Sequence, residues 1–222
     1  MAEGKSEEKL ALASRNKEIV RMMAQAMEDL GYRKAAQVLV EESGVLLESD
    51  IAVSFREAIL GGDWREATRL AKVLQPTNTR DRLHIEYLIY QQDYLETLER
   101  GDTGKAMGIL QDRISTLQPH TSAALQRSIR RLSGLLLSPA EDIPERALWP
   151  SARTNPKASR LALMDRIRRY VPADVFLPPE RLVDLLNQAV EGQHRQCEYH
   201  NVEAPNQSFL SDHSCPRTLI PS

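Results

Sequence analysis

Five residues of the types that bind zinc lie near the C-terminal end of the chain. His194, Cys197 and His200 are spaced three residues apart, and His213 and Cys215 follow them. Imidazole nitrogen and thiolate sulfur are preferred zinc ligands, and steps of three keep successive side chains within one broad face of a helix. Steps of three nevertheless converge on one ion less well than steps of four, and the spacing matches no familiar zinc finger.

The alternative to a metal site is a structural role for the same residues. Cys197 would then be a small buried apolar side chain, and the histidines would cap or pair near the end of a helix. A Cys197–Cys215 disulfide is disfavoured in a reducing compartment. We therefore predict no metal and no cofactor, and we keep His194, Cys197 and His200 as the residues to test for zinc.

Motifs for covalent catalysis or phosphate binding are missing from the sequence. It contains no Gly-x-Ser-x-Gly elbow and no Gly-rich phosphate loop. Its carboxylate pairs, such as Glu7-Glu8 and Glu41-Glu42, are adjacent, so the two side chains of each pair diverge on a helix. We predict no catalytic residue and a protein that is not an enzyme, because an enzyme would need converging polar groups.

Composition limits the partners and the compartment. The chain has 222 residues, of which 41% are hydrophobic, so it can bury a sizeable core in one elongated or two small domains. Lys and Arg number 29 against 31 Asp and Glu, a balance that predicts no nucleic acid and no membrane as partner. Two cysteines, no apolar leader and no run of about 18 apolar residues predict the cytoplasm and nucleus. Two arginine clusters are interpreted as solvated helix faces: Arg127, Arg130 and Arg131, and Arg166, Arg168 and Arg169.

The chain is organised around residues 16–44, which indicate a helix, a tight turn at Gly31 and a shorter second helix. Apolar residues recur at helical spacing from Ile19 to Leu30, so the first helix presents a broad apolar stripe. The second helix is too short to cover this stripe, and a unit of about 30 residues needs a partner to bury it. We therefore predict dimerisation. The predicted interface consists of Ile19, Met22, Met23, Ala26, Met27, Leu30, Tyr32, Ala35 and Leu39.

A second pattern of helix starts and stops follows. A predicted helix from residue 49 stops at Gly62, where Asp63 caps the next helix, and Gly101 with Asp102 repeats this junction. The repetition indicates either a short solenoid or two unrelated hairpins with the same stop and cap chemistry. No alternating strand pattern appears, so we predict an all-α fold without a sheet. The predicted core of the first hairpin contains Phe55, Trp64, Ala67 and Leu70.

The first of these segments resembles a LisH motif. Leu30-Gly31-Tyr32 follows an amphipathic helix, Ala35-Ala36 faces inward, and Glu41-Glu42-Ser43-Gly44 ends the second helix. One departure is Ala36, where many LisH motifs carry Thr. The following segment, with Phe55 and then Gly62-Asp63-Trp64, resembles a CTLH motif.

The remaining helices resemble the CRA region that completes such a module. Cys197-Glu198-Tyr199-His200-Asn201, followed by Asp212-His213-Ser214-Cys215, resembles the stretch that joins the helical module to a propeller in one family, the WD-repeat subunits of the GID/CTLH ubiquitin ligase. The resemblance implies an N-terminal tail and helix start at 1–15, LisH at 16–48, CTLH at 49–105, a CRA-like region at 106–200 and an extended linker at 201–222.

The resemblance also implies a function. This module would be a non-catalytic scaffold that associates with itself and with other LisH-CTLH subunits, as a dimer or tetramer, while RING subunits perform catalysis. Its second interface would lie on the CRA helices, at Leu182, Leu185 and Leu186. The alternative is a Topless-type transcriptional corepressor, whose similar module binds short leucine-rich repression peptides.

Overall fold

The computed structural model describes residues 2–74, 76, 78–117, 122–153, 155–196 and 208–212, with side chains described from residue 12 onward. Most of the described residues are helical, and no strand occurs among them, which confirms the predicted all-α fold. Two compact units are present: residues 1–47 together with 177–222, and residues 48–176. Among the described helices, none combines the length and the apolar composition needed to cross a bilayer.

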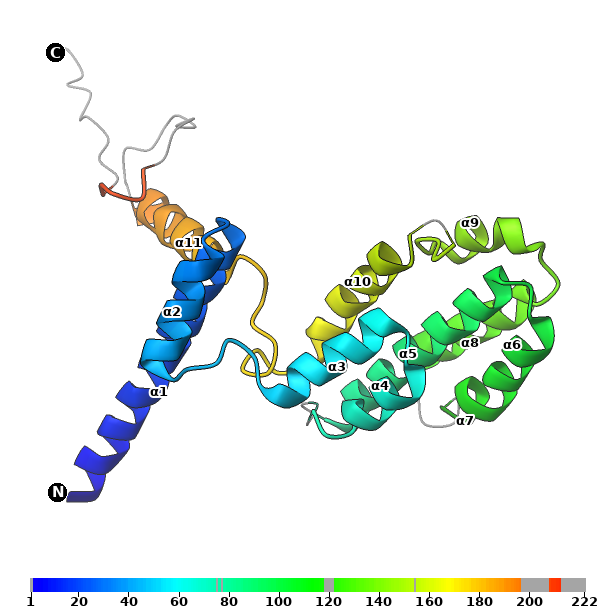
Figure 1. Cartoon of the computed structure of the whole chain (residues 1–222), viewed down its shortest axis with the longest axis horizontal. Coiled ribbons are helices and arrows are strands. Elements are labelled where there is room, and N and C mark those ends of the chain that lie inside the picture. The colour runs from blue at the N-terminus through cyan, green and yellow to red at the C-terminus, as the bar shows by residue number, and fades with distance from the viewer. Residues whose placement is uncertain are drawn as a thin grey trace, which may run out of the picture. The chain divides into compact units, whose positions relative to one another are not determined.

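The first unit contains three helices, namely α1 (Ala2–Asp29), α2 (Arg33–Ser43) and α11 (Arg181–Gln196). Figure 1 shows α2 beside the C-terminal half of α1. The turn between them depends on Gly31, whose φ of 88° is the left-handed conformation that glycine adopts at the lowest cost. The α1 helix reaches Ala2, further than the sequence predicted, because residues 5–15 are mostly good helix formers.

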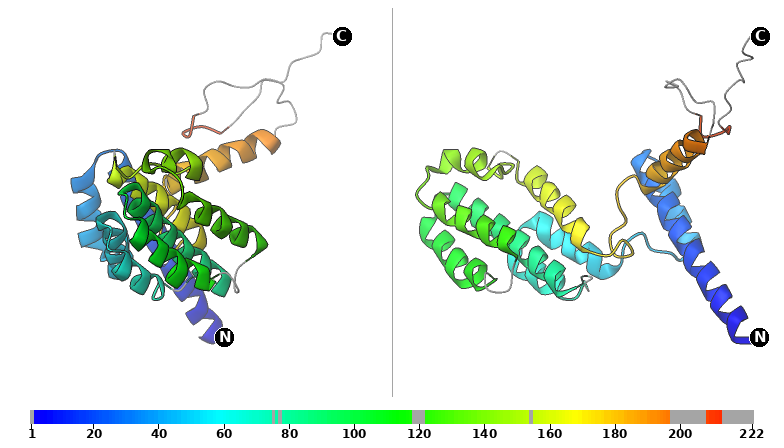
Figure 2. Two further views of the ribbon diagram at one scale, coloured as in Figure 1. Left: turned by 90° about the vertical axis from the view of Figure 1, so that its right-hand side faces the viewer. Right: turned by 180° about the vertical axis from the view of Figure 1, so that it is seen from behind.

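The second unit is a stack of helices in which α5 is central, since it contacts α4, α6, α9 and α10. Figure 2 shows this stack from two further sides. Its elements are α3 (Asp50–Gly61), α4 (Trp64–Ala71), α5 (Thr79–Glu99), α6 (Thr103–Ile109), the π-helical η1 (Leu110–Ile114), α7 (Ser115–Leu117), α8 (Ala123–Leu135), the 3-10 turn η3 (Ala140–Asp142), α9 (Ile143–Ala147), α10 (Pro156–Ile167) and the 3-10 turn η4 (Arg168–Tyr170).

The two Gly-Asp junctions have the same geometry. Gly62 and Gly101 have φ values of 78° and 83°, and each is followed by an aspartate whose carboxylate accepts a hydrogen bond from a backbone N–H three residues later. The helices they join differ, because α3 and α4 have 12 and 8 residues whereas α5 and α6 have 21 and 7. The junction therefore recurs without a repeated hairpin.

Most of the core of this unit is apolar. Phe55, Trp64, Ala67 and Leu70 are all buried in it, with exposed fractions of 0 to 8%. Tyr94 is also buried, and its hydroxyl donates a hydrogen bond to the backbone carbonyl of Leu132. These side chains join α3, α4, α5 and α8 into one cluster.

A polar network crosses the same core. The Arg160 guanidinium donates to both carboxylate oxygens of Glu96, over 3.0 and 2.8 Å, and to the backbone carbonyl of Leu60 over 2.8 Å. The same guanidinium lies over the ring of Trp64, 5.3 Å from its centroid. Hydrogen bonds to Glu96 raise the pKa of Arg160 above its ordinary value. Arg160 thus links α10 to α5 and to the α3–α4 turn.

Gly62 packs directly against this guanidinium, and its replacement by alanine should destabilise the fold. A Cβ added at Gly62 would lie 2.5 Å from Nη2 of Arg160, whereas a Cβ at Gly101 would meet no atom within 4 Å. Both residues have a positive φ, so each alanine costs about 1 kcal/mol of backbone strain. We expect Gly101→Ala to lower the free energy of unfolding in urea by that amount and Gly62→Ala by at least twice as much. Equal losses would contradict the packing of Arg160 on Gly62.

Candidate self-association surface

Four exposed apolar residues form one line along α1. Leu12, Ile19, Met23 and Leu30 are 58, 43, 40 and 73% exposed. With about 100° of rotation per residue, their side chains lie within about 20° of one direction. We call this line the α1 stripe.

The α1 stripe points away from the other two helices of its unit. Ala24, which is 1% exposed, lies about 120° around the helix from the stripe, and Ala36 on α2 is buried to the same extent. Small side chains at these two positions let the packed helices approach each other closely. Gln25 lies about 140° from the stripe on the other side. The α2 helix and the start of α11 therefore leave the stripe uncovered.

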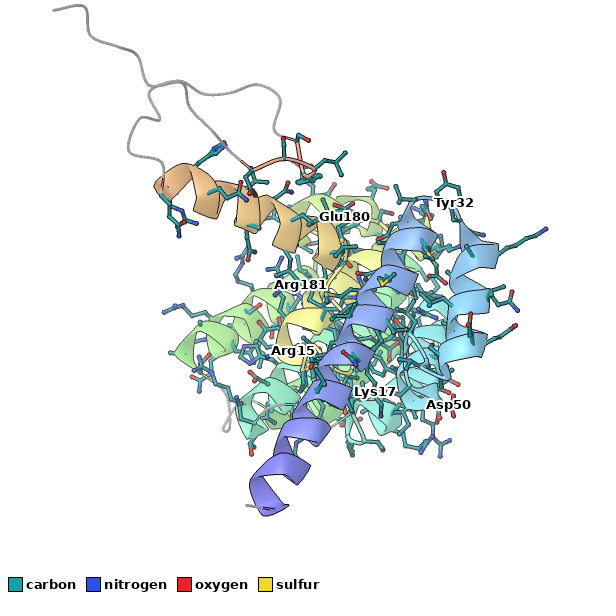
Figure 3. All side chains as sticks on the ribbon, turned by 90° about the vertical axis from the view of Figure 1, so that its left-hand side faces the viewer. Arg15, Lys17, Tyr32, Asp50, Glu180 and Arg181 are labelled. Atoms are coloured by element: carbon teal, nitrogen blue, oxygen red, sulfur yellow. The ribbon has the colours of Figure 1, made fainter. Side chains whose placement is uncertain are left out.

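Gln25 joins α11 to α1. Its side-chain nitrogen donates to the carbonyl of Pro178 over 3.0 Å, and its side-chain oxygen accepts from the backbone N–H of Arg181 over 3.3 Å. This oxygen occupies a capping position at the start of α11, where backbone N–H groups lack helical partners. Figure 3 shows α1 with Glu180 and Arg181 at the start of α11. No periodicity in the sequence indicates this contact, and we did not predict it.

Replacing Gln25 should loosen α11. We expect Gln25→Ala to lower the protection of the α11 amides from hydrogen exchange by about thirtyfold, because two hydrogen bonds worth about 1 kcal/mol each are lost. Gln37→Ala on α2 is the matched control, since Gln37 bonds only Glu41 one turn further along its own exposed helix face. Equal protection of α11 in both variants would contradict the role of Gln25.

The predicted interface residues on α1 and α2 divide into an exposed group and a half-buried group. Ile19, Met23, Leu30, Tyr32 and Ala35 are exposed. The others are half-buried: Met22, Ala26, Met27 and Leu39. The candidates for a second interface lie on α11, which contacts α1 and belongs to the same unit. The rest of the expected CRA-like region belongs to the other unit. These candidates are Leu182 and Leu185, which are half-buried, and Leu186, which is exposed.

The described core of the first unit is small. Among its described side chains, the buried apolar residues are Ala24, Ala36 and Val190. Two alanines and one valine remove little apolar surface from water, at about 25 cal/mol per Å². Helices of this length gain most of their stability from packing an apolar face. The described side chains of this unit therefore supply few of the apolar contacts that would stabilise it within one chain.

Of the five His and Cys residues considered as zinc ligands, the structure describes one. Cys197, His200, His213 and Cys215 lie outside the described residues, whereas His194 lies within α11. No group of three or more His, Cys, Asp or Glu that could hold a metal ion occurs among the described residues.

A cavity of about 350 Å³ in the second unit is lined by Glu96, Glu99 and Arg160 among others. Both carboxylates have structural partners, since Glu96 binds Arg160 and Glu99 accepts the backbone N–H groups of Ala152 and Arg153 over 3.0 and 2.9 Å. Carboxylates fixed in this way hold the 150–153 turn and α10 against α5. The arrangement is that of a structural network.

Comparisons with known proteins agree with this geometry. Residues 14–49 match the family described as the WDR26 Lis-homology domain. The chain is 33% identical over 214 residues to the WD repeat-containing protein 26 homolog of Drosophila melanogaster, covering 93% of this chain and 33% of the relative. It is 27% identical to GID complex subunit 7 of Schizosaccharomyces pombe, covering 92% of this chain and 38% of the relative. Topless-related protein 3 of Arabidopsis thaliana is 23% identical, with 92% of this chain and 18% of the relative covered.

These matches confirm the resemblance found in the sequence, and the chain spans about a third of the length of its WD-repeat relatives. The α1 stripe and α2 fall within the matched 14–49 segment except for Leu12. The chain therefore carries a Lis-homology domain of the WDR26 type and is, over most of its length, a homologue of WDR26 and of GID complex subunit 7.

Proposed function

We propose that this chain is the self-association module of a scaffold subunit in a GID/CTLH-type ubiquitin ligase. The observation that carries the proposal is the uncovered α1 stripe on a unit whose described core is three small apolar residues. A second copy of the chain, or a related LisH-CTLH subunit, supplies the missing apolar surface. The similarity to GID complex subunit 7 supports the placement in such a ligase.

In this role the chain is not catalytic and acts in the cytoplasm and nucleus. Residues 16–48 form the LisH dimerisation motif, 49–105 the CTLH motif and 106–200 the CRA-like region. The α11 helix, at the end of that region, contributes Leu182, Leu185 and Leu186 to a second interface beside the LisH helices. Residues 201–222 form a linker toward a WD-repeat propeller.

Solution mass measured by light scattering over a wide concentration range tests the proposal. We expect a dimer or tetramer at low micromolar concentration, because an interface that buries the α1 stripe of two copies removes several large side chains from water. A monomer of about 25 kDa at every concentration would overturn the proposal. Pairing with sister subunits is tested by co-purification with the related LisH-CTLH chains.

A second candidate function is supported by a basic cavity of about 220 Å³ between α5, α8 and α9. Leu132, Leu135 and Leu148 provide its apolar part, and Arg131 and Arg146 its charges. Such a site could hold a short leucine-rich repression peptide, as in a Topless-type corepressor. Titration of that peptide should then saturate at micromolar concentration and fail with Arg131→Glu. Absence of binding to the unmodified chain would exclude this function.

A further inference from the structure

The α1 stripe is part of a regular heptad pattern. Leu12, Asn16, Ile19, Met23, Ala26 and Leu30 follow one another at steps of four, three, four, three and four residues. This spacing defines the a and d positions of a helix that pairs with another helix along its whole length. Asn16 is exposed and Ala26 is half-buried, so the full seam remains accessible within one chain.

Two opposite charges lie on one flank of this seam. Arg15, Met22 and Asp29 are spaced seven residues apart and occupy the same flanking position of successive heptads. Arg15 and Asp29 are exposed, and within the described part of the chain neither forms an ion pair. They are separated by about 21 Å along α1, at about 1.5 Å per residue, so they do not reach each other within one helix. Figure 3 labels Arg15 on this helix.

We propose that α1 pairs in antiparallel orientation with α1 of a second copy, and that Arg15 pairs with the partner's Asp29. In an antiparallel pair the a residues face the partner's d residues, and residues of this flank face the same flank of the partner. The register that places Ile19 against the partner's Met23 also places Leu12 against the partner's Leu30. The same register brings Arg15 to the partner's Asp29, and the two-fold axis repeats this ion pair.

A parallel pair lacks this complementarity. In parallel register, Arg15 would face the opposite flank of the partner, near the partner's Val20, and Asn16 would face its own copy. The two charges would then find no opposite charge across the seam. The antiparallel arrangement pairs both, keeps the apolar layers together and leaves Asn16 beside the partner's small Ala26. Charge complementarity therefore selects both the occupant, a second copy, and its orientation.

Charge reversal tests this orientation, which rests on the proposed self-association. With the full chain, Arg15→Glu alone and Asp29→Arg alone should each weaken the dimer about tenfold, because two attractive contacts become repulsive. The mixture of the two variants should restore the wild-type affinity, because each heterodimer regains both ion pairs. Native mass spectrometry resolves the species, and heterodimers should greatly exceed the statistical half of all dimers.

The matched control is Lys17→Glu, which reverses a neighbouring exposed charge on the opposite side of α1 from Arg15. It should leave the affinity unchanged and show no preference for the Asp29→Arg variant. Salt near 1 M should reduce the effects of both reversals on the seam. Stable dimers with statistical mixing would overturn the antiparallel pairing and leave the proposed function standing, whereas a monomeric wild-type chain would overturn both.

Discussion

Replacing Arg160 with alanine is expected to lower the free energy of unfolding by about 3 kcal/mol, because removal of one partner leaves a buried charge unpaired. The Glu96 side chain is 5% exposed and that of Arg160 is 15% exposed. Without the guanidinium, the carboxylate of Glu96 would keep only the hydrogen bond from Gln92, at 3.1 Å. The variant also loses the contact with the Trp64 ring and the bond to Leu60. Urea unfolding followed by circular dichroism measures the loss.

Arg69→Ala is the matched control for this prediction. Arg69 also pairs with a glutamate, Glu66, but their side chains are 63 and 40% exposed, so solvent replaces a lost partner. We expect no measurable change in the midpoint of unfolding for this variant. A similar loss in Arg69→Ala and Arg160→Ala would show that burial does not determine the contribution of these ion pairs.

The Arg160 variant also tests the contact with Gly62. Since the three atoms nearest to a Cβ at Gly62 all belong to the Arg160 guanidinium, the clash predicted for Gly62→Ala should be relieved when Arg160 is absent. In the Arg160→Ala background, Gly62→Ala should cost about 1 kcal/mol, the backbone strain expected at Gly101. If the double variant lost the sum of the unfolding free energies that the two single variants lose, the direct contact between Gly62 and Arg160 would be contradicted.

The Ile19→Asp, Met23→Asp double variant is expected to raise the dissociation constant of the self-associated chain by on the order of 1,000-fold or more. Both residues lie at the centre of the α1 stripe, where a partner helix would bury them. Each introduced carboxylate would be desolvated without a counter-charge, at a cost of about 2 kcal/mol or more. Light scattering at low micromolar concentration should then report a monomer.

The second unit offers a control of equal exposure. Leu161 and Met107 are 44 and 48% exposed, close to the 43 and 40% of Ile19 and Met23. The Leu161→Asp, Met107→Asp variant introduces the same charges on apolar surface outside the α1 stripe, so its mass should match that of the wild type. An unchanged mass in the α1 double variant would remove α1 as the main contact and leave the α11 residues as the alternative.

The two predictions can be separated from each other by measuring both properties on each variant. Arg160→Ala alters a network inside residues 48–176, so it should lower the unfolding midpoint while the mass stays unchanged. The α1 double variant alters the other unit, so it should change the mass while the helices of residues 48–176 stay folded. A lower solution mass for Arg160→Ala than for the wild type would show that self-association depends on the second unit.

The sequence by itself determined the apolar periodicity and the helix boundaries at the glycine turns, although not the start of α1 at Ala2. Gly31, Gly62 and Gly101 take the left-handed conformation, and Asp63 and Asp102 cap the next helices as expected. These features depend on residues within about four positions of one another, so local sequence specifies them. The all-α fold follows from the same periodicity. The family resemblance rested on the LisH residues, on the Gly62-Asp63 turn and on the stretch from Cys197 to Cys215.

Only the tertiary structure decided which distant segments meet. Gln25 bonds the start of α11 across more than 150 residues, and Arg160 reaches Glu96 across 64. Neither pair has a characteristic spacing, because hydrogen bonds between distant polar side chains depend on how the helices pack. The sequence therefore could not predict that α11 groups with α1. It also could not predict that a charged network is buried beside α5. The apolar stripe could be read because its period is that of a single helix.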